Sequence, residues 1–176
     1  LCDCTGYRLD GTDTEPSMYV GIIINRSLAG TTDSVTGLGD VHALVNAIGE
    51  MRRVAREAGF IAIKVDDIAE VNARFGFDAG DRVLAESAAC LMECSRGKGR
   101  LFRSTGPTFV ALFDDFDPEE TDAIADEIER FLGSPVLIGS LEYQPPIRVA
   151  TLHLDAVDRQ PVSILNELKA LLGKAV

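Results

Sequence analysis

The stretch LFRSTGPTFVALF, Leu101 to Phe113, decides the fold. It reads as two strands, LFRS and FVALF, because both segments are rich in the aromatic and aliphatic residues that favour strands. Gly106 and Pro107, between them, are typical of a tight reversal. A hairpin joins antiparallel neighbours, so the sheet that contains it is not purely parallel. Its tip presents side chains on a rigid support, which makes it a candidate site.

Upstream of the hairpin, the hydrophobic pattern changes period several times. Residues 1–16 are polar and predict turns, whereas MYVGIIIN, Met18 to Asn25, predicts a strand. From Leu38 the apolar residues recur every three or four positions, which indicates a helix capped by Asp40 and stopped by Gly59. FIAIKVD, Phe60 to Asp66, predicts a strand that alternates its two faces, with Ile61, Ile63 and Val65 opposite Ala62, Lys64 and Asp66.

Helices and strands alternate through the rest of the chain. DIAEVNARFG predicts a short helix ended by Gly76, and Asp78 is the expected cap of a longer helix that reaches Cys94. DPEE predicts the start of another helix with Pro118 at its first position. PVLIGS and PIRVATLHL predict strands, and PVSILNELKALLGKA a last helix. The predicted class is α/β in the α+β sense: a ferredoxin-like mixed, mainly antiparallel sheet flanked by helices.

Composition narrows the classes of partner. The net charge of −11 repels phosphate backbones, so we expect no nucleic acid partner. No apolar run approaches the roughly 20 residues that span a bilayer, so we expect no direct membrane contact. The start LCDC lacks the basic end of a secretion signal, which favours a cytoplasmic location. The chain begins without methionine, and we expect it to be a piece of a longer protein.

The four cysteines allow two interpretations. Cys90 and Cys94 are four residues apart in a predicted helix, so they share a face and are expected to pack as small hydrophobic residues. Four thiolates would also suffice for zinc if Cys2 and Cys4 joined them. The C-x-C and C-x-x-x-C spacings match the usual zinc pairs poorly, so we expect no metal.

Three separated motifs stand in one order: DSVTGLGD from Asp33 to Asp40, VNARFGFDAGDRVL from Val71 to Leu84, and RSTGPTF from Arg103 to Phe109. Together they resemble the GGDEF family, the diguanylate cyclases, from residue 33 to about residue 174. The second motif is the specific one, because five of its residues match at the required spacing: Asn72, Gly76, Gly80, Asp81 and Leu84.

The resemblance implies a nucleotide-cyclase-like fold and an activity. In the family, two GTP molecules are condensed into cyclic di-GMP, with one half-site from each subunit of a dimer and two Mg²⁺ ions. The metals lie between the first acid of D-I-D and the first acid of GGDEF. The asparagine and aspartate that correspond to Asn72 and Asp81 hydrogen-bond the guanine.

The sequence departs from the family at the metal ligands. Lys64 stands at the first acid of D-I-D, and Pro107 and Thr108 stand at the two acids of GGDEF. A unit positive charge about 4 Å from Mg²⁺ would be repelled by roughly 8 kcal/mol at an effective dielectric constant of 20. We therefore expect no catalytic residue and no Mg²⁺ in a degenerate signature hairpin that comprises Arg103, Thr105, Gly106, Pro107, Thr108 and Phe109.

Other family positions have also changed. Phe77 replaces a histidine, and Ala175 replaces a phosphate-binding lysine of the last helix. The product-inhibition site, R-x-x-D in the family, keeps Arg96 but has Gly99 in place of its acid. We expect cyclic di-GMP not to bind there tightly, because Arg96 lacks its partner acid.

Several roles stay open at the level of sequence. Asn72 and Asp81 either serve structure, as a helix end and a first-turn acid, or bind the guanine of GTP or GDP. Lys64 either pairs with Asp66 or Asp67 or meets a phosphate directly. Arg103 is interpreted as a strand-edge charge, and the two histidines, His42 and His153, are given no role.

These expectations combine into one hypothesis with two alternatives. Residues 1–32 resemble the last strand and linker of a PAS-type sensor, and residues 33–176 form a degenerate GGDEF domain. The domain is expected to pass a signal between a sensor and a phosphodiesterase-like output domain, by forming a homodimer or by weak guanine-nucleotide binding. The alternatives are a diguanylate cyclase with residual activity and a protein-interaction module that binds no nucleotide.

Overall fold

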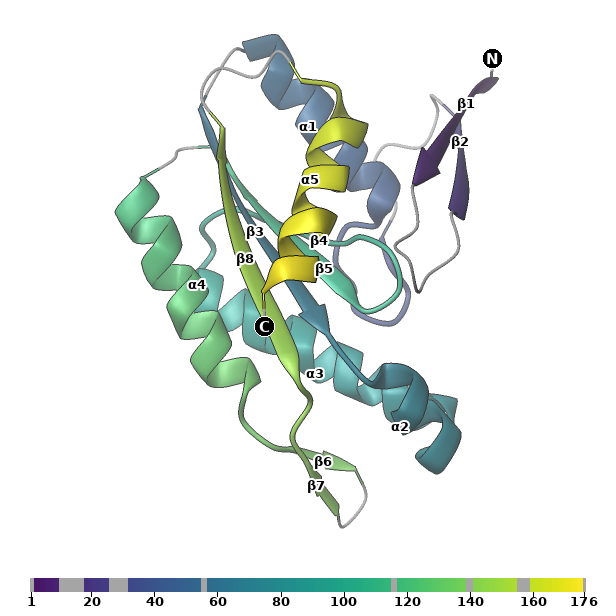
Figure 1. The fold of residues 1–176 in the computed structure, drawn as a ribbon, viewed down its shortest axis with the longest axis vertical. Helices are drawn as coiled ribbons and strands as arrows, with labels where there is room; N and C mark the ends of the chain where they lie inside the picture. The colour runs from purple at the N-terminus through teal and green to yellow at the C-terminus, as the bar shows by residue number, and fades with distance from the viewer. Residues whose placement is uncertain are drawn as a thin grey trace.

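A four-stranded antiparallel sheet forms the centre of the molecule (Figure 1). The structure, a computed structural model, describes residues 2–9, 18–25, 32–54, 57–114, 117–138, 141–154 and 159–175. The central strands lie in the order β4-β5-β3-β8, and each pair of neighbours is antiparallel. This order confirms the predicted ferredoxin-like class. The elements are β1 (Cys2–Leu9), β2 (Met18–Asn25), α1 (Val41–Val54), β3 (Ala58–Val65), α2 (Ile68–Phe75), α3 (Phe77–Ser95), β4 (Arg100–Arg103), β5 (Thr108–Phe113), α4 (Pro118–Leu132), β6 (Val136–Ile138), β7 (Leu141–Tyr143), β8 (Ile147–Leu154) and α5 (Pro161–Lys174).

Both faces of the sheet are buried, and strand β3 divides the core in two. Ile61, Ile63 and Val65 pack into one hydrophobic cluster with α2, α3 and α4. Phe60 and Ala62 pack into a second cluster with α1 and α5. The alternation read from the sequence is therefore confirmed. Because helices cover both faces, functional side chains are left to the ends of the strands.

Some element boundaries differ from the predictions. Gly59 lies inside β3, and the helix that it was expected to stop has its end at Val54, four residues before β3 begins at Ala58. Asp40 accepts hydrogen bonds from the backbone N–H groups of His42 and Ala43, at 2.9 and 3.0 Å, as a helix cap does. Asp78 does not cap α3, because the helix already begins at Phe77 with Gly76 as its cap residue.

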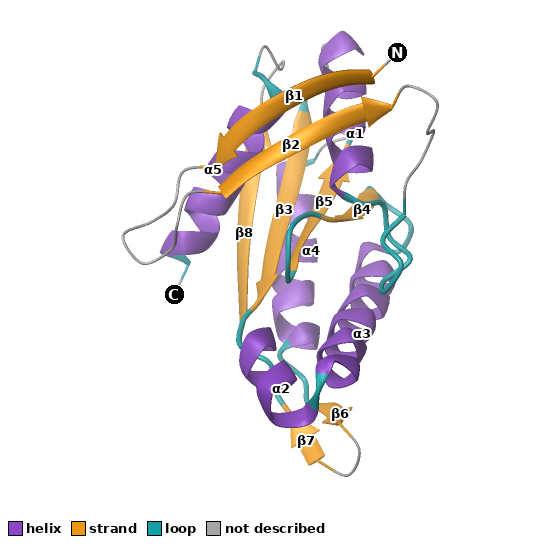
Figure 2. Cartoon of the chain, turned by 90° about the vertical axis from the view of Figure 1, so that its right-hand side faces the viewer, coloured by secondary structure: helices purple, strands orange, loops and turns teal. Residues whose placement is uncertain are grey.

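Two small sheets were only half predicted. β1 lies where the sequence indicated turns, and it pairs along its whole length with β2. β7, which was not predicted, pairs with β6 near α2 and α3 (Figure 2). β7 was missed because a strand of three residues is too short to show an alternating pattern. β1 was missed because its residues favour turns, and its pairing with β2 stabilises the strand. The predicted linker after β2 falls mainly on residues 26–31, outside the described part of the chain.

None of the helices in the described part of the chain combines the length and apolar character that a membrane crossing requires.

Candidate nucleotide site at the end of strand β3

The predicted hairpin joins β4 to β5 and places its tip beside the last residues of β3. Thr108 and Ser104 close the turn, with the N–H of Ser104 donating to the carbonyl of Thr108 at 2.8 Å. Gly106 has a φ of +56°, which glycine adopts at little cost. The N–H of Val65 donates to the Pro107 carbonyl at 3.1 Å, and Phe109 is buried beneath the tip. The backbone therefore holds Pro107 and Thr108 against the end of β3.

Lys64, at that strand end, is part of a charged cluster. Its Nζ lies 3.4 Å from Oδ1 of Asp66, so pairing with Asp66 rather than Asp67 is observed. Arg148 of β8 holds the same carboxylate with two hydrogen bonds, Nε to Oδ2 at 2.6 Å and Nη2 to Oδ1 at 2.7 Å. These bonds from Arg148, with the charge of Lys64, hold the pKa of Asp66 below its ordinary value despite partial burial.

Arg103 is the last residue of the edge strand β4, as the sequence indicated, and it also belongs to a second ion pair. Its side chain is 15% exposed, and Nη1 lies 3.0 and 3.2 Å from the two carboxylate oxygens of Asp33. Nε donates to the carbonyl of Gly106 at 3.1 Å. Burial acts to raise the pKa of Asp33, but hydrogen bonds from Thr36 and Arg103 outweigh it and leave that pKa lowered. The first and third motifs of the sequence thus meet through this pair.

The second motif brings α2 against α3 at Asn72 and Gly80. A Cβ on Gly80 would lie 1.9 Å from the Asn72 Oδ1 atom, so only glycine fits here. That oxygen is buried and has no hydrogen-bond partner. Asn72 does not cap the end of α2 with its side chain, because the Gly76 N–H donates to the backbone carbonyl of Asn72 at 2.9 Å. Asp81, next to Gly80, is exposed but lies beyond the first turn of α3, whose acid is Asp78, so Asp81 is not the first-turn acid that the sequence suggested.

The turn between α3 and β4 contains Arg96 and Gly99. Arg96 is exposed, and its Nη2 donates to both carboxylate oxygens of Glu127 at 3.0 and 3.3 Å. Gly99 has a φ of +75°, and a Cβ there would lie 2.8 Å from the ring of Phe113. The position of Gly99 therefore disfavours any side chain, including an acid. Two cavities of about 380 and 160 Å³ flank this turn.

Cys90 and Cys94 pack together, as expected. Their Sγ atoms lie 3.9 Å apart, and Cys94 belongs to the core. Burial raises the pKa of Cys90 to about 12. Among the residues that the structure describes, no group of three or more histidine, cysteine, aspartate or glutamate side chains is placed to hold a metal ion.

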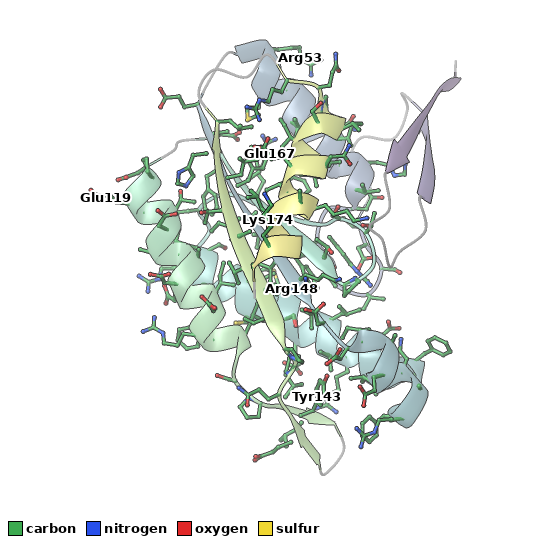
Figure 3. All side chains as sticks on the ribbon, viewed as in Figure 1. Arg53, Glu119, Tyr143, Arg148, Glu167 and Lys174 are labelled. Atoms are coloured by element: carbon green, nitrogen blue, oxygen red, sulfur yellow. The ribbon has the colours of Figure 1, made fainter. Side chains whose placement is uncertain are left out.

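Sequence reasoning missed Arg148. It is opposite Lys64 in the pairing of β8 with β3, and its Nη1 donates to the Leu172 carbonyl of α5 at 3.0 Å (Figure 3). The available signal was a single arginine in a predicted strand whose other charged or titratable residue is His153, because a partly buried charge needs a partner.

Comparisons with known proteins identify the class. The family model described as diguanylate cyclase, GGDEF domain, matches residues 31–140, more than half of the 176 residues. The chain therefore belongs to the GGDEF domain family, as the motifs predicted.

Among curated relatives, diguanylate cyclase DgcS of Shewanella oneidensis is 28% identical over 90 residues, which are 49% of this chain and 30% of that protein. Cyclic di-GMP phosphodiesterase PdeR of Escherichia coli is 27% identical over 113 residues, which are 63% of this chain and 17% of that protein. The chain thus spans less than a third of either relative.

Solved structures share the fold. The GGDEF domain of FimX from Pseudomonas aeruginosa superimposes with a TM-score of 0.76 at 17% identity, covering 84% of this chain and 94% of that one. Diguanylate cyclase SiaD from the same organism, solved in complex with its activator SiaC, gives a TM-score of 0.75 at 20% identity, covering 81% and 56%.

Proposed function

We propose that this domain is a non-catalytic, regulatory GGDEF domain of a cyclic di-GMP signalling protein, and that it binds a guanine nucleotide weakly without Mg²⁺. The observation that carries the proposal is the cluster at the end of β3, where Lys64 and Arg148 both pair with Asp66. The chain is similar to a diguanylate cyclase and to a cyclic di-GMP phosphodiesterase, and both proteins are much longer than this chain. Their lengths support a role beside sensor and output domains in a larger protein.

The residues at this strand end do not fit a two-metal centre. Mg²⁺ binds oxygen ligands, usually one or two carboxylates with waters and phosphate oxygens. The Asp66 carboxylate already holds both cations, and Pro107 offers only a carbonyl, which accepts from Val65. A lysine ammonium in the same place repels a divalent cation. We therefore assign catalysis of cyclic di-GMP formation to no residue of this chain.

Guanine recognition is assigned to the pair Asn72 and Asp81. The buried Asn72 oxygen lacks a partner, which is costly unless a ligand or water supplies a donor. Asp81 is exposed, and it directly follows Gly80, the residue of α3 against which the Asn72 side chain packs. An amide and a carboxylate together offer groups that complement the acceptors and donors along a guanine edge.

The proposal is tested by titrating the protein with GTP, GDP and ATP, in chelator and in excess Mg²⁺, followed by NMR shifts and melting temperature. We expect dissociation constants of tens to hundreds of micromolar for GTP and GDP, weaker ATP binding, and no effect of chelator. Asn72→Ala and Lys64→Asp should each weaken binding. The exposed substitution Asp126→Asn on α4 is the control and should not.

The other outcomes identify the alternatives. No response at millimolar GTP would leave an interaction module that binds no nucleotide. A response that requires Mg²⁺ would contradict the proposal and favour a cyclase with an unusual metal site.

A further inference from the structure

We propose that Lys64 and Arg148 form a phosphate-binding pair that meets the diphosphate part of a nucleotide directly, and that this pair is joined to the last turn of α5. The inference deepens the proposed nucleotide binding and rests on it for the identity of the base. The phosphate contact itself is a separate claim that can be tested without a base.

The pair is built by strand register. Lys64 of β3 and Arg148 of β8 are directly opposite each other, so their side chains leave the sheet on the same face. Asp66 bridges them, because its Oδ1 lies 3.4 Å from Lys64 Nζ and 2.7 Å from Arg148 Nη2. The N–H of Asp66 donates to the Pro146 carbonyl at 2.8 Å, which fixes the bridging residue. The two cations are thus held close together before any ligand arrives.

The charge of the cluster favours an anion. The pKa of Asp66 is lowered by Arg148, so two cations face one carboxylate and the trio carries one net positive charge on a chain of net charge −11. All three side chains are partly exposed, at 30% for Lys64, 28% for Arg148 and 23% for Asp66. Asp67, the next residue, is an exposed acid and lowers the affinity that we expect. A diphosphate fits two cations better than a single phosphate does, because lysine and arginine each contact a separate oxyanion group.

Arg148 also connects this cluster to the C-terminal helix. Its Nη1 donates to the carbonyl of Leu172, one of the last carbonyls of α5, which have no partner inside the helix. Figure 3 shows Arg148 beside the last turn of that helix. A phosphate that draws the guanidinium toward itself competes with this bond. Ligand binding at the end of β3 should therefore change the environment of the last residues of α5.

The test titrates inorganic pyrophosphate into the protein in chelator, at constant ionic strength, with sulfate as the control anion. Backbone NMR shifts of Lys64 and of residues 171–175 report binding. We expect saturable pyrophosphate binding in the millimolar range or tighter and weaker sulfate binding. Arg148→Gln and Lys64→Gln should each weaken it by about tenfold. Arg159→Gln, which removes an exposed arginine paired with Glu167 on α5, should change it less than about twofold.

Arg148→Gln leaves Asp66 without its partner and could destabilise the fold. The double variant Asp66→Asn with Arg148→Gln removes both charges together, and its melting temperature shows whether the domain is folded. A folded double variant that binds pyrophosphate like the wild type would overturn the inference, and so would sulfate binding of equal strength. Shifts at residue 64 without shifts at residues 171–175 would overturn the link to α5.

Guanosine separates this inference from the proposed function. If guanosine binds through Asn72 and pyrophosphate does not bind, the phosphate pair is wrong and the guanine site stands. If pyrophosphate binds through Arg148 and guanosine gives no response, the phosphate pair stands and guanine recognition is wrong.

Discussion

Gly80 sets how closely α3 approaches α2, and through that distance it positions Asn72. Any side chain on Gly80 would overlap the Asn72 Oδ1 atom, which lies 1.9 Å from the required Cβ position, and its Cγ atom at 2.9 Å. The Asn72 side chain is short, so it would have to rotate away as a whole. The requirement for glycine at this residue is therefore a requirement for one particular orientation of Asn72.

We predict that Gly80→Ala lowers the free energy of unfolding by about 1 kcal/mol, since overpacking exceeds the gain in helix propensity. It should also weaken GTP binding as much as Asn72→Ala does. Gly49→Ala in α1 is the matched control, because nothing lies within 4 Å of its Cβ position, and it should stabilise by about 0.5 kcal/mol. Urea denaturation and the GTP titration measure both effects. Stabilisation of both variants alike would contradict this account of Gly80.

Asp66 should make the stability of the domain depend on pH in acid. Its pKa is lowered from 3.8 by Arg148, so the unfolded chain takes up the proton more readily than the folded protein. The contribution of Asp66 is therefore complete above pH 3.8 and is lost as the pH falls through the lowered pKa of the folded state. We predict that Asp66→Asn flattens the decline of stability over this range, measured by urea denaturation at several pH values. Asp126→Asn on the exposed face of α4 should leave the decline unchanged.

At the scale of single elements, the acids at the starts of α3 and α4 illustrate two kinds of helix start. Asp117 accepts a hydrogen bond from the Glu119 N–H at 3.0 Å and caps α4. Asp78 makes no such bond in α3 and acts only through its charge near the helix dipole. The same residue type therefore contributes differently at the two helices, according to its position relative to the first turn.

We predict that Asp117→Ala costs about 1 kcal/mol of stability, as lost caps usually do, and that Asp78→Ala costs about half of that. Salt separates the two contributions further, because screening weakens the dipole interaction of Asp78 more than the short hydrogen bond of Asp117. Melting temperatures at low and high salt measure this. Equal losses for both variants at high salt would refute the distinction.

The turn from α3 into β4 is linked to α4 by the ion pair between Arg96 and Glu127, which uses both carboxylate oxygens. With its guanidinium paired to α4, and with glycine at position 99, Arg96 offers a nucleotide phosphate little. We predict no cyclic di-GMP binding tighter than about 1 μM by calorimetry. Glu127→Gln should raise affinity for the dinucleotide, since it releases Arg96. A submicromolar constant that Arg96→Ala abolishes would refute this prediction.

At the scale of the whole molecule, two hydrophobic layers hold the ends of the strands in place. Helices α3 and α4 cover one face of the sheet, and α1 and α5 cover the other. The end of β3, the hairpin tip and the end of α5 therefore meet at one edge of a rigid core. The proposed phosphate contacts and the last turn of α5 are close together for this reason.

We predict that the purified domain, given GTP and Mg²⁺, forms no cyclic di-GMP above a control without protein, as measured by chromatography. Lys64 and Pro107 supply no metal ligand, and two paired half-sites would not restore one. Restoring acids as Lys64→Asp with Pro107→Asp and Thr108→Glu tests whether these residues alone account for the loss. Product from the unmodified domain would overturn the proposed function.

The amino-acid sequence by itself determined the local elements and the family. The alternation of β3, the cap at Asp40, the start of α4 at Pro118 and the reversal at Gly106 depend on neighbouring residues, and all were predicted. The predictions failed for β1 and for Gly59, where the local sequence favours a turn or a helix end. In both places a partner strand stabilises an extended conformation that local propensity does not favour.

Only the tertiary structure decided which charges meet. Arg103 pairs with Asp33 across 70 residues, and Arg148 pairs with Asp66 across 82 residues. The first pair depends on how the segment before α1 packs against β4, and the second depends on the register of β3 against β8, which a one-residue shift would destroy. Local sequence patterns do not encode these arrangements, because they follow from the packing of distant segments on both faces of the sheet. The orientation of Asn72 also follows from tertiary packing, because it is set by the contact between α2 and α3, to which both helices contribute.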